Sequence, residues 1–542
     1  MRGVLAAAGL AALSAAPAPG TPQPPACAAL AGVRIAPAAI GLPTRGAEVT
    51  EARTVAASAA LARPAYCRVL ARIRPIDRSA PDIRFELDLP EAWNGKALMV
   101  GGGGFDGVIP DTAGPLLDQP SPRILGPLAR GYAVFGGDSG HQAANPDAPT
   151  PAVDGAFALN DEAFANYAGD AVKKTRDAAV ALIVRHAGHG PTRTYVAGGS
   201  NGGREALLAI ARWPSDFDGA IAAFPFRDAG TTALAFGAVY RAFAQPGAYP
   251  NPSKRALVQA AAVSACDGLD GLQDGLVANV EACRFDPARL RCPGGAEAGD
   301  DCLSDPQIAA LMTFARPFAF PDGPAGRPRT YPGYTVLAGG QLKDAQLGSV
   351  APGSPPRAAM PLGAWYWDQL ARFAVARDAA FDPGTLDPAH PGRLARRLDD
   401  VVNRLDVDAT HLQRFRARGG KLIVYHGLAD PLVSHRATIA YASQLEAAMG
   451  RDAARGFARF YAIPGYGHGS GDFLPEWDAL AVLEAWAERG EAPAALVVAD
   501  RGRSRSRPLC ELGWWPRYQG HGDPDAASSF RCQRDAATGR AP

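Results

Sequence analysis

Three residues whose side chains could carry out nucleophilic catalysis follow one another along the chain, each close to glycines. Ser200 lies in the run GGSNG, Asp430 follows the apolar run LIVY at 422–425, and His468 lies in the run GYGHG. A serine hydroxyl attacks a carbonyl carbon once an imidazole takes its proton, and a carboxylate can orient that imidazole and stabilise its charge. The residue types and their order therefore predict Ser200 as nucleophile, His468 as proton acceptor and Asp430 as the partner of His468.

The segment around Ser200 predicts the local structure that such a nucleophile needs. Residues 195–204 read YVAGGSNGGR, and a helical pattern continues to 211. A strand, a tight turn on a glycine-flanked Ser and a helix make up the nucleophile elbow of an α/β-hydrolase. Glycines are needed there because the Ser backbone is strained and the strand and helix pass close together. In a chain with 61 glycines the Gly-x-Ser-x-Gly pattern alone is a weak signal, so the prediction depends on the flanking elements and on the order Ser, Asp, His.

Alternating strand and helix patterns surround this elbow. Segments with the alternation or apolar run of a strand lie at 66–73, 83–90, 93–100, 132–138, 195–199, 217–225, 419–427 and 457–464. Helical spacing predicts helices over 161–186 and 473–489. The alternation favours an α/β sheet with connections on both faces. Residues 28–65 have no clear period, and we expect them to lie against the domain surface.

The regular pattern is lost between residues 227 and 415, which are rich in Pro, Gly and aromatic residues and hold four of the eight cysteines. We expect an inserted lid domain here, and an α/β-hydrolase catalytic domain formed by residues 19–226 and 416–542. Within the lid, the run WYW at 365–367 and Phe373 either stack on an aromatic acyl group or form a buried aromatic cluster.

A glycine run, GGGGFDG at 101–107, directly follows a predicted strand. Such a loop lets a backbone N–H approach a developing oxyanion, and we favour this role over a flexible surface loop. Three other histidines lie near predicted site segments. We expect His141 to line the site, His426 to be a core or supporting residue, and His435 to lie on the helix after Asp430.

The N-terminus has the pattern of a secretory signal peptide, which we assign to residues 1–18. One Arg precedes an apolar run that ends at Leu13 and is followed by small residues. This run is too short to cross a bilayer, and no other stretch is long and apolar enough. We therefore expect a secreted or periplasmic protein, and the Ala-, Arg- and Pro-rich composition is typical of a GC-rich bacterial gene.

Eight cysteines behind a signal peptide indicate disulfides, although eight allow 105 pairings. Proximity in the sequence favours Cys266–Cys283, Cys292–Cys302 and Cys510–Cys532, which leaves Cys27–Cys67. The chain has no Cys-x-x-Cys, and no His clusters with its cysteines, which argues against a zinc site.

The balance of charge argues against a nucleic-acid partner. Lys and Arg number 55 against 54 Asp and Glu, so the net charge is +1 and leaves no basic excess to bind phosphates. The short basic run RGRSRSR at 501–507 is the exception, and we expect a solvated surface loop there.

A second unusual segment is the acidic run CDGLDGLQDGLV at 266–277. Its three carboxylates lie within eight residues, so they repel one another unless water or a cation neutralises them. Carboxylate oxygens suit Ca²⁺, although the spacing is not that of an EF-hand. A structural calcium site and an acidic solvated loop are the two interpretations.

Taken together, the motifs of this chain resemble those of the tannase and feruloyl esterase family, which includes mono(2-hydroxyethyl) terephthalate hydrolases. The matching segments are WNG at 93–95, 101–107, SNGGR at 200–204, 266–283, 425–430 and PGYGH at 464–468. The resemblance covers residues 27–532 and implies an α/β-hydrolase with a large lid. It also implies oxyanion amides from Gly104 and Asn201. The calcium ligands that it implies are the side chains of Asp267, Asp270 and Asp274 and the carbonyls of Leu272 and Leu276.

The chain departs from the family at two positions. Members usually carry a Cys before the nucleophile and another after the His, joined as a disulfide; here the two residues are Gly199 and Gly469. The eight cysteines present match the family's other four pairs. The triad chemistry needs no disulfide, so we still expect hydrolysis, and the loss bears on loop rigidity and on the choice of substrate.

The sequence therefore predicts a secreted serine ester hydrolase that acts through an acyl-enzyme on a small-molecule ester. By the resemblance, the acyl group is aromatic: a gallate, a hydroxycinnamate or a terephthalate half-ester. The alternatives are a general carboxylesterase or polyester-oligomer hydrolase, a serine peptidase, and a non-catalytic binding protein on a hydrolase scaffold. Covalent labelling of Ser200 by a fluorophosphonate separates the enzymes from the binding protein.

Overall fold

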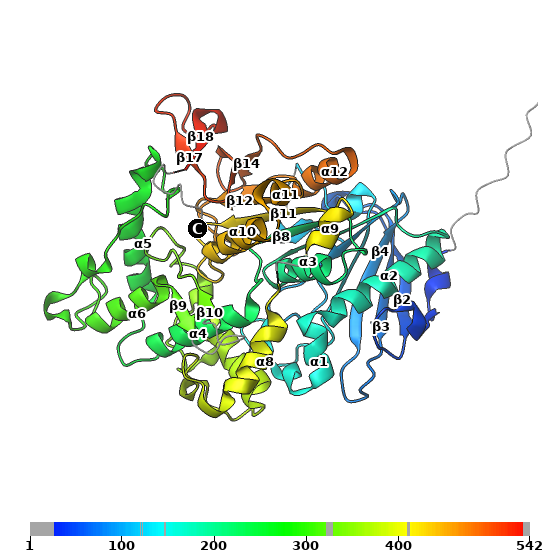
Figure 1. Cartoon of the computed structure of the whole chain (residues 1–542), viewed down its shortest axis with the longest axis horizontal. Coiled ribbons are helices and arrows are strands. Elements are labelled where there is room, and N and C mark those ends of the chain that lie inside the picture. Colours follow the sequence, from blue (N-terminus) through cyan, green and yellow to red (C-terminus); the bar gives the residue numbers. More distant parts are fainter. Residues whose placement is uncertain are drawn as a thin grey trace, which may run out of the picture.

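The computed structural model describes residues 26–534 except for positions 120, 122, 146–147, 321–328 and 409–411. The predicted signal peptide, residues 1–18, lies outside this part of the chain. Within it, eleven strands form one large mixed sheet (Figure 1). In their order across the sheet these strands are β1 (Arg34–Ile35), β2 (Ala47–Val55), β3 (Tyr66–Ile73), β4 (Ile83–Pro90), β6 (Ala133–Gly137), β5 (Lys96–Val100), β7 (Arg193–Gly199), β8 (Gly219–Ala223), β11 (Lys421–Gly427), β12 (Ala458–Ile463) and β16 (Cys510–Glu511).

The central strands, from β6 to β12 in this order, all run parallel, and antiparallel strands flank them on both sides. The carboxyl ends of parallel strands meet at one edge of a sheet, where ligands of open α/β folds bind. Strands β7, β11 and β12 lead directly into the segments that carry Ser200, Asp430 and His468. The topology therefore delivers all three predicted residues to the same edge.

Helices cover both faces of this central part (Figure 1). Along β7, Tyr195 and Ala197 pack in the same core as α12 (Ala479–Arg489), whereas Val196 packs with α2 (Ala171–Ala187) and α3 (Asn201–Arg212). Strands that are buried on both faces are apolar throughout, which explains the runs that identified them in the sequence.

Three predicted elements differ from the structure. The helix over 161–186 is divided into α1 (Asp161–Ala165) and α2 by a π-helical turn in which Gly169 has a φ of +144°. The helix predicted from 473 begins at Ala479, because Pro475–Glu476 form the short strand β13 against β14 (Val497–Asp500). Residues 28–65 were expected on the surface, but 47–55 form β2, which pairs with β3 over its whole length. Much of β2 is exposed on this flank of the sheet, so its side chains do not show a clear alternation.

The segment 227–415 is mostly helical and has its own core. Its helices are α4 (Ala229–Phe243), α5 (Pro252–Cys266), α6 (Asp305–Ala315), α7 (Leu362–Gln369), α8 (Ala395–Leu405) and the start of α9 (Gln413–Ala417). Among its described residues no strand joins the main sheet, and β9 (Phe318–Phe320) and β10 (Arg329–Tyr331) pair only with each other. In Figure 1, α4, α5, α6, α8, β9 and β10 gather at one side of the sheet, whereas α9 lies over the sheet near α3. We therefore propose the predicted division into a catalytic domain (19–226 and 416–542) and a lid (227–415).

The disulfides are the three favoured by sequence proximity, Cys266–Cys283, Cys292–Cys302 and Cys510–Cys532, and the remaining pair Cys27–Cys67. No cysteine in the described part of the chain is free. The longest loop, 40 residues, is closed by the bond that fastens the N-terminal segment to β3. None of the helices built from described residues is both long enough and apolar enough to span a bilayer.

The packing of the sheet predicts a large difference between two identical substitutions. Leu87 on β4 is fully buried, whereas Leu61 is 59% exposed. Leu87→Ala leaves a cavity and should lower the free energy of unfolding by about 2–5 kcal/mol, whereas Leu61→Ala should change it by less than about 0.5 kcal/mol. Urea unfolding followed by tryptophan fluorescence measures both, and equal losses would contradict the packing described here.

Candidate active site

The structure brings the three predicted residues into contact at the edge of the sheet. His468 Nε2 lies 2.9 Å from Ser200 Oγ, and His468 Nδ1 lies 2.8 Å from Asp430 Oδ2. Both contacts are hydrogen bonds, although His468 lies 268 positions after Ser200 and 38 positions after Asp430 in the sequence. In this arrangement an imidazole can take a proton from the hydroxyl while a carboxylate holds its other nitrogen.

Ser200 is held in a strained turn between β7 and α3, with φ +55° and ψ −120°. Its N–H donates to the carbonyl of Ala223, and its own carbonyl accepts from the N–H of Phe226. The glycines on either side are required by close backbone contact. A Cβ on Gly198 would lie 2.3 Å from the carbonyl carbon of Gly202, well inside van der Waals contact. These backbone contacts fix the hydroxyl at the start of the helix.

Asp430 is buried, and both of its oxygens accept hydrogen bonds. Oδ1 accepts from the N–H groups of Leu432 and Val433, each at 2.8 Å. Burial by itself raises the pKa of Asp430, but the charge of His468 and hydrogen bonds from His426 and His468 hold that pKa well below its usual range. The carboxylate is therefore ionised at neutral pH and can balance a positive charge on His468.

His426 is a second histidine at Asp430 and contacts the same carboxylate oxygen as His468. Its Nε2 lies 3.3 Å from Asp430 Oδ2 and 3.0 Å from the carbonyl oxygen of Val433, and its Nδ1 lies 2.8 Å from Thr438 Oγ1. Because both partners of Nε2 are acceptors, Nε2 carries a hydrogen, and the Thr438 hydroxyl is the partner of Nδ1. Of the two roles expected for His426, the structure shows the supporting one.

The two residues predicted to supply oxyanion amides lie beside the elbow. Asn201 is the first residue of α3, and Gly104 has a φ of +64° in the glycine-rich loop. Among the hydrogen bonds between described residues, none uses the backbone N–H of Gly104 or of Asn201. A helix N-terminus carries partial positive charge, so such N–H groups can stabilise a negative oxygen. A side chain at position 104 is excluded, since its Cβ would lie 2.0 Å from the carbonyl oxygen of Ala152.

Aromatic packing fills the space beside Gly199. At this position the family that the chain resembles usually carries a cysteine of a disulfide. A Cβ on Gly199 would lie 2.9 Å from Cζ of Phe224. The Phe224 ring meets the rings of His468 and Tyr466 edge-on, at 4.8 and 5.8 Å between centroids. The lid adds a hydrogen bond from Gln346 Nε2 to the carbonyl of His468. These contacts hold the His468 loop without a disulfide, and only the aromatic character of position 224 could have suggested them from the sequence.

The other two histidines that the sequence places near the site, His141 and His435, do not join the triad. His141 is buried, stacks on Phe157 at 3.8 Å and has its pKa lowered to about 4 by burial. His435 is also buried, with Nε2 3.6 Å from Glu281. No hydrogen bond between described residues connects either ring to Ser200, Asp430 or His468, so neither is placed to act on a substrate with them.

The aromatic run of the lid divides into two roles. Trp365 and Trp367 are buried, and their indole N–H groups donate to the carbonyls of Val153 and Pro383, so they belong to the lid core. Phe373 packs against the same core. Tyr366 lies at the glycine-rich loop, with its hydroxyl oxygen 2.9 Å from the place of a Cβ on Gly104. Of this run, Tyr366 is the residue that borders the candidate oxyanion site.

The acidic loop is partly neutralised by a residue that the sequence did not identify. Arg507 forms an ion pair with Asp274, while Asp267 and Asp270 accept backbone N–H groups of Gly275 and Leu272. The expectation that 501–507 is a solvated loop is wrong for Arg505 and Arg507, which are 6% and 2% exposed. Arg505 is paired with Asp500. Arg505 and Arg507 therefore pack inward against carboxylates, whereas Arg503 is exposed.

The donor set of the acidic loop fits a hard cation. Burial, followed by the charges of Asp274 and Asp267, raises the pKa of Asp270 to about 7. A carboxylate in such surroundings is stabilised by a nearby positive charge, and oxygen donors suit Ca²⁺. The described residues nevertheless contain no group of three or more His, Cys, Asp or Glu side chains already gathered as a metal site.

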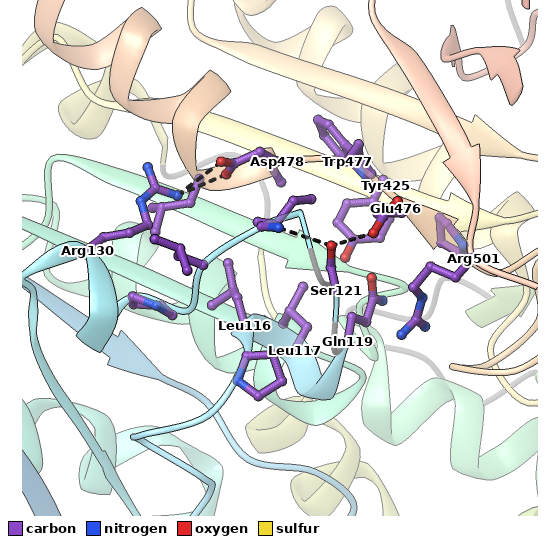
Figure 2. A pocket seen from close by; sticks show the side chains of 17 residues that line it. Leu116, Leu117, Gln119, Ser121, Arg130, Tyr425, Glu476, Trp477, Asp478 and Arg501 are labelled. Carbon is purple, nitrogen blue, oxygen red and sulfur yellow. Dashed lines mark hydrogen bonds and ion pairs between the residues drawn. The ribbon is translucent and has the colours of Figure 1, made fainter. Parts of the chain in front are cut away.

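Figure 2 shows a small cavity apart from the triad. It is lined by Leu116, Tyr425 and Trp477, among others, and no residue of the triad lines it. Gln119, in its wall, donates to the hydroxyl of Tyr466, two residues before His468. Its volume of about 40 Å³ holds only a few water molecules. This cavity is therefore too small to be the place where an ester would bind. Its wall residue Gln119 instead helps to hold the His468 loop through Tyr466.

Comparison with known proteins identifies relatives over nearly the whole chain. The family model for tannase and feruloyl esterase matches residues 67–533. A protein of Agrobacterium fabrum described as an uncharacterized esterase is 37% identical over 534 residues, covering 94% of this chain and 93% of its own. Mono(2-hydroxyethyl) terephthalate hydrolase of Piscinibacter sakaiensis is 31% identical, with 88% and 86% covered. The crystal structure of feruloyl esterase B from Aspergillus oryzae has a TM-score of 0.74 at 22% identity, covering 92% of this chain and 98% of that one. The structural likeness confirms the predicted α/β-hydrolase fold.

The surroundings of Asp430 predict how Asp430→Asn changes stability with pH. A carboxylate whose pKa is lowered by folding stabilises the fold above its unfolded pKa of about 3.9 and loses this contribution as pH falls towards the folded value. The variant should therefore be less stable than wild type by about 2 kcal/mol or more at pH 7, and the difference should shrink below about pH 4. Urea unfolding from pH 3 to 7 measures it, and a difference that is constant with pH would be inconsistent with an ionised Asp430.

Proposed function

The chain belongs to the tannase and feruloyl esterase family, and from this premise we propose that it is a serine carboxylic-ester hydrolase. The observation that carries the proposal is the pair of hydrogen bonds that joins His468 to Ser200 and to Asp430. A binding protein on the same scaffold would not need this alignment of a hydroxyl, an imidazole and a buried carboxylate.

The proposed mechanism has two steps. His468 Nε2 takes the proton of Ser200 as Oγ attacks the ester carbonyl carbon, and the N–H groups of Gly104 and Asn201 stabilise the resulting oxyanion. The tetrahedral intermediate collapses when His468 returns the proton to the leaving alcohol oxygen, which leaves an acyl group on Ser200. A water molecule then attacks the acyl carbon by the same route and releases the acid. Asp430 remains ionised throughout and balances the charge on His468.

We propose that the acyl group is aromatic. Relatives named as a feruloyl esterase and as a mono(2-hydroxyethyl) terephthalate hydrolase support this, since both names denote esters of aromatic acids. Tyr366 beside Gly104 and Phe224 beside His468 supply aromatic surface next to the reacting atoms, and rings of this kind favour aromatic partners. A general carboxylesterase or polyester-oligomer hydrolase uses the same triad and is distinguished by its substrates.

We propose that the protein works outside the cytoplasm, either secreted or in the periplasm. Its four disulfides support this location, because such bonds form and persist in oxidising compartments.

Calcium is proposed as a structural ion of the lid. Asp267, Asp270 and Asp274 would hold it through their side chains, with carbonyls of Leu272 and Leu276, and it would stabilise the disulfide-closed loop 266–283 without entering the reaction.

The enzymatic proposal predicts turnover that depends on one hydroxyl group. Wild type should hydrolyse methyl gallate, methyl ferulate or a terephthalate half-ester faster than p-nitrophenyl octanoate. Ser200→Ala should lower kcat by about 10⁴-fold or more. Ser443→Ala is the matched control and should leave the rates unchanged. It removes a hydroxyl on α10 (His435–Met449) whose one hydrogen bond among the described residues is to the carbonyl of Ile439. Equal rates for wild type and Ser200→Ala on every ester would refute catalysis, and turnover of aliphatic esters alone would refute the aromatic preference.

The calcium proposal predicts a stability that depends on the ion. A ligand at 100 times its Kd stabilises the folded state by about 2.7 kcal/mol, so Ca²⁺ should raise Tm of the EGTA-treated protein by several degrees. Asp270→Asn removes a carboxylate from the loop and should abolish the shift, whereas Asp301→Asn, at an exposed lid position, should retain it. If Ca²⁺ left Tm of the wild type unchanged, the loop would be an acidic loop without a cation.

A further inference from the structure

Two buried carboxyl groups lie directly behind the glycine-rich loop, and the mechanism above does not use them. Asp106, at the end of that loop, is 1% exposed, and Glu205, on α3, is 5% exposed. Carboxyl groups are rarely buried unless they are paired with a cation or fully hydrogen-bonded. Among the described residues neither forms an ion pair with Lys, Arg or His.

Ser139 stands between the two groups. Its hydroxyl contacts Asp106 Oδ2 and lies 3.2 Å from Glu205 Oε1. A hydroxyl has one hydrogen, so it can donate to only one of the two carboxyl groups at a time. The Ser139 hydroxyl thus brings one oxygen of each carboxyl group to the same point. A hydrogen bond between two carboxyl groups requires a proton on one of them, since ionised carboxylates only accept.

The other oxygens of the pair bind the segments that carry the two candidate oxyanion amides. Asp106 Oδ1 accepts from the side-chain Nδ2 of Asn201 at 2.8 Å. Glu205 Oε2 accepts from the backbone N–H of Gly102 at 3.1 Å, two residues before Gly104. The pair therefore connects the glycine-rich loop to the first turn of α3 in both directions, through one side chain from each segment.

The groups around the pair do not neutralise two negative charges. Arg204 is the nearest cation on α3, but its guanidinium donates to the carbonyls of Leu405, Tyr167 and Ala168 and to Asn201 Oδ1. The hydroxyls of Tyr167 and Tyr366 also face the pair, and burial raises the pKa of both, so they stay neutral. Burial, followed by the charge of Glu205 and the hydrogen bond with it, raises the pKa of Asp106 well above its usual range.

We infer that Asp106 and Glu205 share one proton and together act as positioning residues that fix the N–H groups of Gly104 and Asn201 for the oxyanion. The inference rests on the proposed function, because it assigns these amides to an oxyanion. With one proton shared, a single negative charge lies behind the site and the hydrogen bond between the groups is kept. Loss of that proton at alkaline pH places two like charges behind a developing oxyanion, which weakens both the loop and the stabilisation of the transition state.

The test compares the pH dependence of four proteins on the ester that wild type hydrolyses best. In Glu205→Gln the amide can accept from Gly102 and donate to Asp106, as the protonated carboxyl does, so activity near pH 7 should stay within about threefold of wild type. Wild type should lose kcat/KM at alkaline pH as the shared proton is lost, and this fall should disappear in Glu205→Gln, because only one carboxyl group remains. Asp106→Asn should show the same pH dependence of kcat/KM as Glu205→Gln, and it replaces that variant in the test if Glu205→Gln does not fold. Asp88→Asn, at a carboxyl group that is equally buried on β4, is the matched control and should keep the alkaline fall.

A truncation separates positioning from mere stability. Glu205→Ala should lower kcat by about 10- to 100-fold with little change in KM, because misplaced oxyanion donors affect the transition state more than the bound ester. The inference is overturned if Glu205→Gln and Asp106→Asn keep the alkaline fall of wild type, or if Glu205→Ala lowers activity only in proportion to the folded fraction. If wild type hydrolyses no ester, the proposed function itself fails, so the two failures are distinguishable.

Discussion

The backbone of the glycine-rich loop lies directly against the backbone at the start of α3, with no room for a side chain between them. A Cβ on Gly101 would lie 2.6 Å from Cα of Gly202, and a Cβ on Gly202 would lie 2.5 Å from the carbonyl oxygen of Gly102. The Gly202 N–H donates to that same carbonyl. This contact sets how far Gly104 and Asn201 stand from Ser200, so the geometry of the candidate site depends on it.

Charge around the site is balanced within the protein interior. Asp430 stays ionised because two histidines and two backbone N–H groups face it. On the other side of Ser200, the inferred proton between Asp106 and Glu205 limits the charge behind the oxyanion amides to one. A buried carboxylate is thus kept where the positive charge of His468 must be balanced, and one is neutralised where a negative oxygen must form.

Much of the site could be predicted because local sequence determines it. The strained turn at Ser200 needs glycines on both sides, the triad follows a fixed order along the chain, and neighbouring cysteines form the short-range disulfides. What the sequence did not reveal depends on contacts between distant segments. Phe224 meets His468, Arg507 meets Asp274 and Glu205 meets Gly102 only after the sheet has formed. Strand β2 was missed for a different reason, since its exposed flank lacks the apolar alternation that marks a strand.

The central claim is that Ser200 is a nucleophile activated by His468 and Asp430, and one labelling experiment tests it most directly. The full chain is incubated with a serine-directed fluorophosphonate at pH 7.5, and the adduct is mapped by peptide mass spectrometry. The account predicts one phosphonyl group on Ser200 of wild type, none on the Ser200→Ala protein, and much slower labelling of Asp430→Asn. A folded wild-type protein that remains unlabelled at Ser200, or an Asp430→Asn protein that is labelled at the wild-type rate, would contradict it.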